Sequence, residues 1–142
     1  MWKITSIIKY FKNITFDMDG VLCEDPPPDK DFGMPGYEDH LRITNPIYIP
    51  NFEIYQIVTG RREKYRRETL EWLFNNNVKY KRLVLKPTHI PTEKTPYFKA
   101  NIYINSDSEL FIESNEEQSK IIAMISKKPV YYFKKGLIYN FA

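Results

Sequence analysis

The stretch Ile14-Thr15-Phe16-Asp17-Met18-Asp19-Gly20-Val21-Leu22 predicts a short buried strand that ends in two carboxylates and a glycine turn. Ile14 and Phe16 are apolar residues that favour strands, and Gly20 lets the backbone leave the strand sharply. Side chains alternate along an extended backbone, so we expect Asp17 and Asp19 to point to roughly the same side. Two such carboxylates repel each other without a cation, which favours a Mg²⁺ site. An ordinary acidic turn is the alternative, because Asp and Gly are common in turns.

The composition indicates one folded domain. The chain has 142 residues, of which 42% are hydrophobic and 15% aromatic, and this leaves little room for a second domain. A net charge of +3 with mixed signs permits anionic substrates but does not indicate a nucleic-acid protein. The single cysteine, Cys23, excludes an internal disulfide. Without a membrane-length apolar run or a recognisable signal peptide, we expect a cytoplasmic protein.

Two segments are expected to lie outside the main layers. Residues 1–12 place isoleucines at helical spacing and predict a short amphipathic helix, either packed on the sheet or docked on another domain or subunit. Residues 24–50 contain three consecutive prolines at 26–28 and predict a long loop or minimal cap with a short helix near 37–44. The loop is interpreted either as a substrate-contacting flap or as a solvated acidic excursion.

Predicted strands alternate with predicted helices along the rest of the chain. Strands are expected around Ile14, Phe52, Leu83, Leu110 and Val130, and helices over residues 63–77 and from Glu116 onward. Residues 96–105 fit a helix, although Ile102-Tyr103-Ile104 also fits a strand, and a short tail follows Gly136. This alternation is typical of an α/β fold with a parallel sheet and helices on both faces.

Three strand ends carry polar residues. Asp17 and Asp19 follow the first strand, Thr59-Gly60 follows the strand over residues 52–58, and Glu113 ends the strand near Leu110. We expect the second strand to stop at Thr59 and open directly into a helix, which makes a corner suited to an anion. Ser114-Asn115-Glu116-Glu117 is interpreted as a helix capping box. Ligands of such sheets bind beyond the carboxyl ends of the strands.

The densest basic run begins at Arg61 and continues through Arg62, Lys64, Arg66 and Arg67. Helical geometry spreads these side chains around the axis, so only two or three of them can reach one ligand. We interpret Arg61 as a weak substrate or phosphate contact. The others are interpreted as a solvated face.

The order of these features resembles the haloacid dehalogenase superfamily of phosphotransferases. The resemblance spans residues 13–133, and its most specific motifs are Phe16-Asp17-Met18-Asp19-Gly20-Val21, Thr59-Gly60-Arg61 and Leu110-Phe111-Ile112-Glu113-Ser114. A narrower similarity exists to the dehalogenase-like half of bacterial and phage proteins described as phosphoribosyltransferases. The transferase half has no counterpart here. The resemblance implies a single domain over residues 1–142, with a three-layer Rossmann-like fold and a minimal cap.

The resemblance also implies a mechanism. Asp17 would be the nucleophile that forms an aspartyl phosphate, and Asp19 would act as general acid and then as base. The carboxylate of Asp17, the backbone carbonyl of Asp19 and Glu113 would bind Mg²⁺. Thr59 and the Gly60 amide would hold the phosphoryl oxygens.

A lysine that neutralises the nucleophile and the phosphate is also implied. Lys99 matches it best, with Lys86 and Lys94 as alternatives. The corresponding metal motif often carries two acids, whereas Ser114 follows Glu113 here, so Asp107 is a further candidate ligand.

The sequence therefore predicts a Mg²⁺-dependent phosphomonoester hydrolase that acts on a phosphorylated small molecule. A polynucleotide or nucleotide phosphatase is the second hypothesis, although no aromatic stacking platform is identifiable from the sequence. The third is a binding module without turnover that partners a separate transferase.

Overall fold

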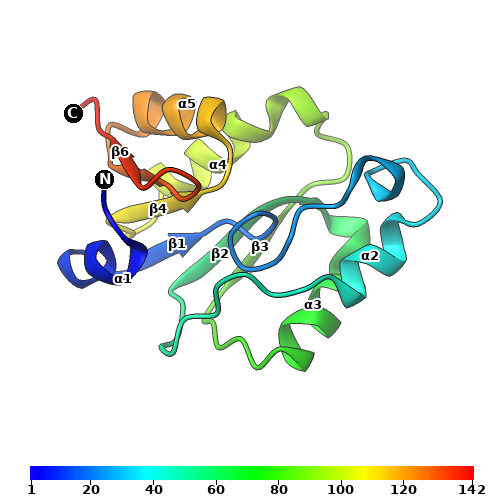
Figure 1. Cartoon of the computed structure of the whole chain (residues 1–142). Helices are drawn as coiled ribbons and strands as arrows, with labels where there is room; N and C mark the ends of the chain where they lie inside the picture. Colours follow the sequence, from blue (N-terminus) through cyan, green and yellow to red (C-terminus); the bar gives the residue numbers. More distant parts are fainter.

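Six strands form one sheet in the computed structural model, which describes residues 1–142 (Figure 1). The strands are β1 (Ile14–Phe16), β2 (Gln56–Arg62), β3 (Leu83–Lys86), β4 (Leu110–Glu113), β5 (Val130–Tyr132) and β6 (Leu137–Tyr139). They lie in the order β3-β2-β1-β4-β5-β6, and all neighbours are parallel except β5 and β6. The predicted α/β fold is confirmed, and the predicted parallel sheet is parallel except at its β5–β6 edge. The short tail predicted after Gly136 was wrong in part, because residues 137–139 pair with β5 as an antiparallel edge strand.

Five α-helices accompany the sheet. They are α1 (Ile4–Ile7), α2 (Tyr37–Ile43), α3 (Arg66–Asn75), α4 (Thr95–Ile104) and α5 (Glu116–Ser126). The segment around residues 102–104 is helical, which settles the choice between helix and strand there. A 3₁₀ turn over Ile8–Tyr10 continues α1, so the helix predicted within residues 1–12 is present but short.

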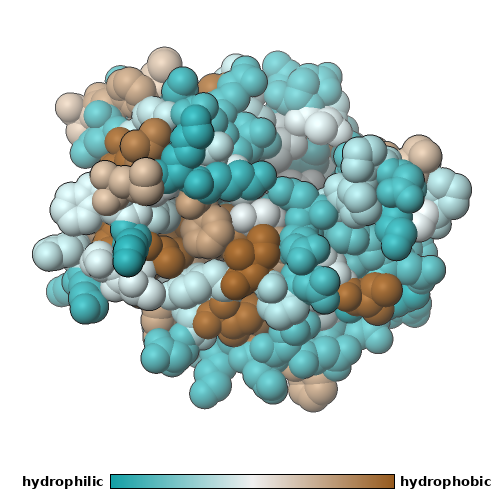
Figure 2. Space-filling view, viewed as in Figure 1, coloured by the Kyte–Doolittle hydropathy of each residue, from teal (hydrophilic) through white to brown (hydrophobic).

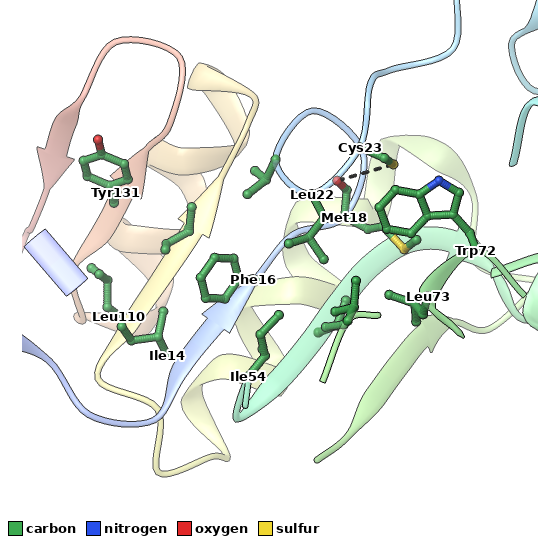
Figure 3. Close-up of a cluster of buried hydrophobic side chains, with 14 of the residues drawn as sticks. Ile14, Phe16, Met18, Leu22, Cys23, Ile54, Trp72, Leu73, Leu110 and Tyr131 are labelled. Carbon is green, nitrogen blue, oxygen red and sulfur yellow. Dashed lines mark hydrogen bonds between the residues drawn. The ribbon is translucent and has the colours of Figure 1, made fainter. Parts of the chain in front are cut away.

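The core lies in two layers, one on each face of the sheet. On one face, Phe16 and its neighbours pack against Trp72 and Leu73 of α3 (Figure 3). On the other face, Val58 and Phe111 pack against α4 and α5. Consecutive strand residues point to opposite faces, so the same strands supply both layers. Helices therefore cover both sides of the sheet, and the carboxyl ends of β1, β2 and β4 reach the same edge.

The buried helical faces are narrower than expected from the sequence. Leu70 and Phe74 of α3 are large apolar residues, but their exposed fractions are 39% and 82%. Ile125 of α5 is likewise exposed, whereas Ile122 is buried. In both helices the buried stripe follows residues three and four apart, and the apolar residues beside it lie on its solvent side.

Residues 24–50 form a long excursion instead of a separate cap domain. It contains a 3₁₀ turn over Pro28–Lys30 and the helix α2, which packs on α3. The Trp72 indole N–H donates a hydrogen bond to the Thr44 carbonyl and fastens the end of α2 to the core. Cys23 is fully buried at the start of this excursion.

The surface in the view of Figure 2 is largely hydrophilic, and its hydrophobic residues gather in separate small patches. Scattered apolar residues of this kind are normal on protein surfaces. None of the helices combines the length and apolar composition that crossing a membrane requires.

Candidate functional site

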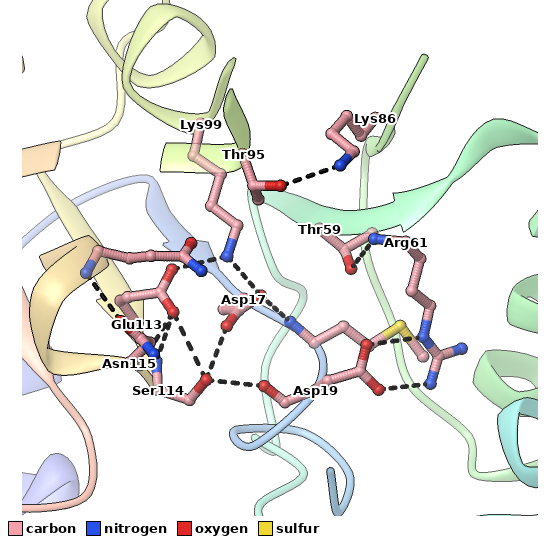
Figure 4. A network of polar contacts seen from close by, with 12 residues as sticks. Asp17, Asp19, Thr59, Arg61, Lys86, Thr95, Lys99, Glu113, Ser114 and Asn115 are labelled. Atoms are coloured by element: carbon pink, nitrogen blue, oxygen red, sulfur yellow. Dashed lines mark hydrogen bonds and ion pairs between the residues drawn. The ribbon is translucent and has the colours of Figure 1, made fainter. Parts of the chain in front are cut away.

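The carboxyl ends of β1 and β4 bring two buried carboxylates together. Phe16 is in register with Ile112, and the Asp17 backbone N–H donates to the Ile112 carbonyl at 2.9 Å. Lys99 enters from α4, with its Nζ atom 2.8 Å from Glu113 Oε1 and 3.3 Å from Asp17 Oδ1 (Figure 4). These three side chains, all of them sequence-predicted site residues, are almost completely buried.

One ammonium group therefore serves two carboxylates. Burial and the Glu113 charge raise the pKa of Asp17 well above its ordinary value, and the Lys99 charge opposes this only in part. Burial lowers the pKa of Lys99, but the charges of Asp17 and Glu113 outweigh it and raise that pKa overall. The arrangement retains an excess of negative charge, so an additional cation would stabilise both carboxylates in their ionised form.

The hydroxyl of Ser114 lies where three oxygen atoms converge. Its Oγ atom is 2.9 Å from the Asp19 carbonyl oxygen, 3.0 Å from Asp17 Oδ2 and 3.5 Å from Glu113 Oε2. A serine hydroxyl carries one proton and can satisfy only one of these acceptors fully. The capping-box interpretation of Ser114 was wrong, because the Asn115 side chain caps α5 by accepting from the Gln118 N–H.

These oxygens fit a magnesium ion in donor type. Two carboxylates, a carbonyl and a hydroxyl are hard oxygen ligands, and Mg²⁺ adds several waters to such a set. The Oε1 atom of Gln118, which also lines the site, is buried without a hydrogen-bond partner and suits a water or ligand donor. No three acidic, histidine or cysteine side chains gather into a metal site. Any site here thus depends on the Asp19 carbonyl instead of its carboxylate.

Asp17 and Asp19 both line the same cleft, but their carboxylates have different partners. β1 ends at Phe16 and the chain turns at once, with the Val21 and Leu22 N–H groups bonded to the Met18 carbonyl. Asp19 instead forms a two-pronged ion pair with Arg61, at 3.0 Å from Nε and 2.9 Å from Nη2 (Figure 4).

Arg61 is buried and fully engaged. Its guanidinium also contacts the Thr69 hydroxyl at 3.2 Å and the Cys23 sulfur at 3.4 Å. Burial tends to raise the pKa of Asp19, but the charge and hydrogen bonds of Arg61 hold it below its ordinary value. The residue interpreted as a substrate contact is therefore committed to Asp19 in this structure.

Gly20 allows the turn to approach Ser114 closely. Its φ is +85°, and a Cβ atom at this position would lie 2.6 Å from the Ser114 Cβ. A side chain here would both strain the backbone and push the Ser114 hydroxyl away from the Asp19 carbonyl.

We expected β2 to end at Thr59, but it continues to Arg62. Thr59 is in register with Leu85 and Arg62 with Lys86, so Gly60 and Arg61 bulge out of the ladder. A 3₁₀ turn over Glu63–Tyr65 then separates β2 from α3. The predicted anion corner at the start of that helix is therefore wrong, although the buried Thr59 still lines the site.

A cleft of about 300 Å³ opens over these strand ends. The predicted loop supplies one wall, including Asp25, Asp31 and Phe32, and Lys134 of the β5–β6 turn reaches Asp25 at 3.3 Å. The loop thus borders the site, in line with the flap interpretation.

The three candidate lysines have distinct places. Lys99 contacts the acids, Lys86 lines the cleft with its Nζ 2.9 Å from the Thr95 hydroxyl, and Lys94 is exposed outside the cleft. Asp107 precedes β4 and lies at the opposite edge of the sheet, so it does not belong to this site.

Sequence reasoning missed the roles of Ser114 and Lys86. The only signal for Ser114 was its place directly after the strand-end acid.

Comparisons with protein-family models, curated proteins and solved structures found no match. The geometry of the site is therefore what supports a functional assignment.

Proposed function

We propose that this chain is a Mg²⁺-dependent phosphomonoester hydrolase of the haloacid dehalogenase type. The observation that supports this most is the environment of Asp17. One of its oxygens, Oδ1, faces the Lys99 ammonium, and the other, Oδ2, faces the oxygen cluster around Ser114. The Asp17 carboxylate thus lies between the Lys99 ammonium and the oxygen cluster that suits a metal ion. Positive charge on both sides suits nucleophilic attack by this carboxylate on a phosphate.

Asp17 Oδ2, the Asp19 carbonyl and Glu113 Oε2 would hold the magnesium ion. Bound there, the ion would offset the charge of the phosphoryl oxygens next to the nucleophile. Glu113 is fixed for this role because its Oε2 accepts from the Ser114 and Asn115 backbone N–H groups at 2.9 and 3.1 Å.

In the first step, an Asp17 oxygen attacks phosphorus and forms the aspartyl phosphate. The bond from phosphorus to the leaving oxygen breaks, and that oxygen takes a proton from Asp19. Lys99 and the Thr59–Gly60 segment would hold the phosphoryl oxygens as the charge moves. Because Asp19 is paired with Arg61, protonated Asp19 requires that ion pair to loosen when a substrate enters.

In the second step, water attacks the aspartyl phosphate. Asp19 accepts the proton of that water, the bond between Asp17 and phosphorus breaks, and phosphate and the Asp17 carboxylate are restored. The ionised state that Arg61 favours is the state that this step needs from Asp19.

The test is hydrolysis of an aryl phosphate with and without Mg²⁺. We expect activity that requires the metal and falls by at least about a thousandfold in Asp17→Asn, because the nucleophile is lost. Asp29→Asn makes the same chemical change on the exposed loop and should leave the activity unchanged. Metal-independent activity, or an active Asp17→Asn variant, would contradict the proposal.

A panel of phosphorylated substrates belongs to the same experiment. Nucleotides are included because Phe32 and Tyr37 line the cleft and contact each other edge to face, with ring centroids 5.7 Å apart. These aromatic side chains, which the sequence did not identify as a platform, favour the nucleotide phosphatase as second candidate. Absence of hydrolysis across the whole panel by the folded protein would instead favour the binding module.

A further inference from the structure

Lys86 differs from the other buried cations of the cleft. Arg61 is paired with Asp19, and Lys99 is paired with Asp17 and Glu113. Lys86 has an exposed fraction of only 1%, yet its Nζ contacts no carboxylate, and its hydrogen-bond partner is the Thr95 hydroxyl. A buried ammonium without a counter-charge is costly to a folded protein.

The surroundings of Lys86 are positive as well. Its neighbour in β2 is Arg62, whose guanidinium is held by the Thr88 and Ile90 carbonyls and also has no acidic partner. Burial and the charges of Arg62 and Lys99 lower the pKa of Lys86 to about 8, and the charge of Glu93 opposes this only in part. We call Lys86, Thr95 and Arg62 the basic wall of the cleft. A negatively charged ligand group at this wall would balance the excess positive charge there.

This basic wall is next to the catalytic acids but separate from them. Gly60 lies directly against Thr95, the partner of Lys86, because a Cβ on Gly60 would come within 2.8 Å of Thr95 Cγ2. In the view of Figure 4, Thr95 and Lys86 lie toward the upper right, away from Ser114 at the lower left. All of these residues line the same cleft, so one ligand can reach both ends.

We propose that Lys86, Thr95 and Arg62 form a second anion subsite that binds a phosphate group other than the one at Asp17. Resting on the proposed function, this defines the substrate class as phosphomonoesters that carry a second phosphate. The Lys86 ammonium and Thr95 hydroxyl donate to this second group, and Arg62 adds long-range attraction.

The test is calorimetric binding of phosphate, pyrophosphate and tripolyphosphate. All proteins carry Asp17→Asn and are measured with Mg²⁺, so that no ligand is cleaved. We expect the affinity to rise from phosphate to tripolyphosphate. In Lys86→Met this gain in affinity should be smaller by a factor of at least about ten. Lys86→Arg should keep most of it, because the charge is retained. Lys94→Met, which removes an exposed lysine of the neighbouring turn, should match the parent.

Equal affinity for the three ligands, or an unchanged rise in Lys86→Met, would overturn the subsite. Thermal melts show whether each variant folds, and Lys86→Gln, which also removes the charge, replaces Lys86→Met if that variant does not fold. The result is independent of turnover: if the protein with Asp17 intact hydrolyses none of the substrates while the rise still depends on Lys86, the proposed hydrolase is refuted and the subsite is kept. The second phosphate can belong to a nucleotide or to a sugar. Comparing a nucleoside bisphosphate and a sugar bisphosphate, each with its monophosphate, then distinguishes these two sources.

Discussion

Ser114 contributes a single hydroxyl proton to a point where oxygens of Asp17, Asp19 and Glu113 meet. We expect Ser114→Ala to lower the affinity for Mg²⁺ about tenfold, because the hydroxyl orients the Asp17 carboxylate and the Asp19 carbonyl. The measurement is the Mg²⁺ concentration that gives half-maximal hydrolysis, together with calorimetric binding of the ion. Ser6→Ala, on the exposed side of α1, is the control. The same Mg²⁺ affinity in both variants would show that Ser114 only fills space.

The sequence placed some site residues well at this scale and others poorly. Asp17 and Glu113 could be predicted because each stands at the end of a short apolar strand, whereas Lys99 was a candidate only through the family resemblance. The ion pair of the Asp19 carboxylate could not be predicted, since its partner, Arg61, is 42 positions away in the chain. The isolation of Lys86 could not be predicted at all, because a missing counter-charge is visible only when every neighbour is known.

Among the elements, β2 matters most for the site. Its bulge places Gly60 against the first turn of α4, where the space for a side chain is absent. We expect Gly60→Ala to destabilise the fold by about 2 kcal/mol and to reduce hydrolysis, because the new methyl group pushes Thr95 away. Adding Thr95→Ser should restore much of both, since it removes the Cγ2 atom and keeps the hydroxyl. Urea unfolding and the aryl phosphate assay measure the two effects.

No recovery in the Gly60→Ala, Thr95→Ser double variant would mean that the glycine is needed for its backbone and not for close packing.

The same strand shows the limit of local sequence signals. Thr59-Gly60 has the composition of a strand end, but pairing with β3 carries β2 on to Arg62. In contrast, β1, β4 and β5 are short apolar runs bounded by polar residues, and their positions were predicted closely.

For the molecule as a whole, the site holds more buried negative charge than the neighbouring cations balance. Asp17, Asp19 and Glu113 face only Lys99 and Arg61. We expect Mg²⁺ at about a hundred times its Kd to stabilise the fold by about 2.7 kcal/mol and to raise the Tm by several degrees. Sodium chloride of equal ionic strength is the reference. Glu113→Gln should lose the increase, and Glu117→Gln, an exposed change on α5, should retain it. An equal increase with sodium chloride would mean general screening.

The pairing of β1 with β4 has a consequence for how the protein is made. Asp17 and Ser114 are 97 residues apart in the chain, yet they meet in the finished sheet. During synthesis, the β1 segment leaves the ribosome long before its central partner exists, and only β2 is available beside it in the meantime. Contacts of such long range form slowly. The nascent chain therefore completes the candidate site only after β4 and α5 have emerged.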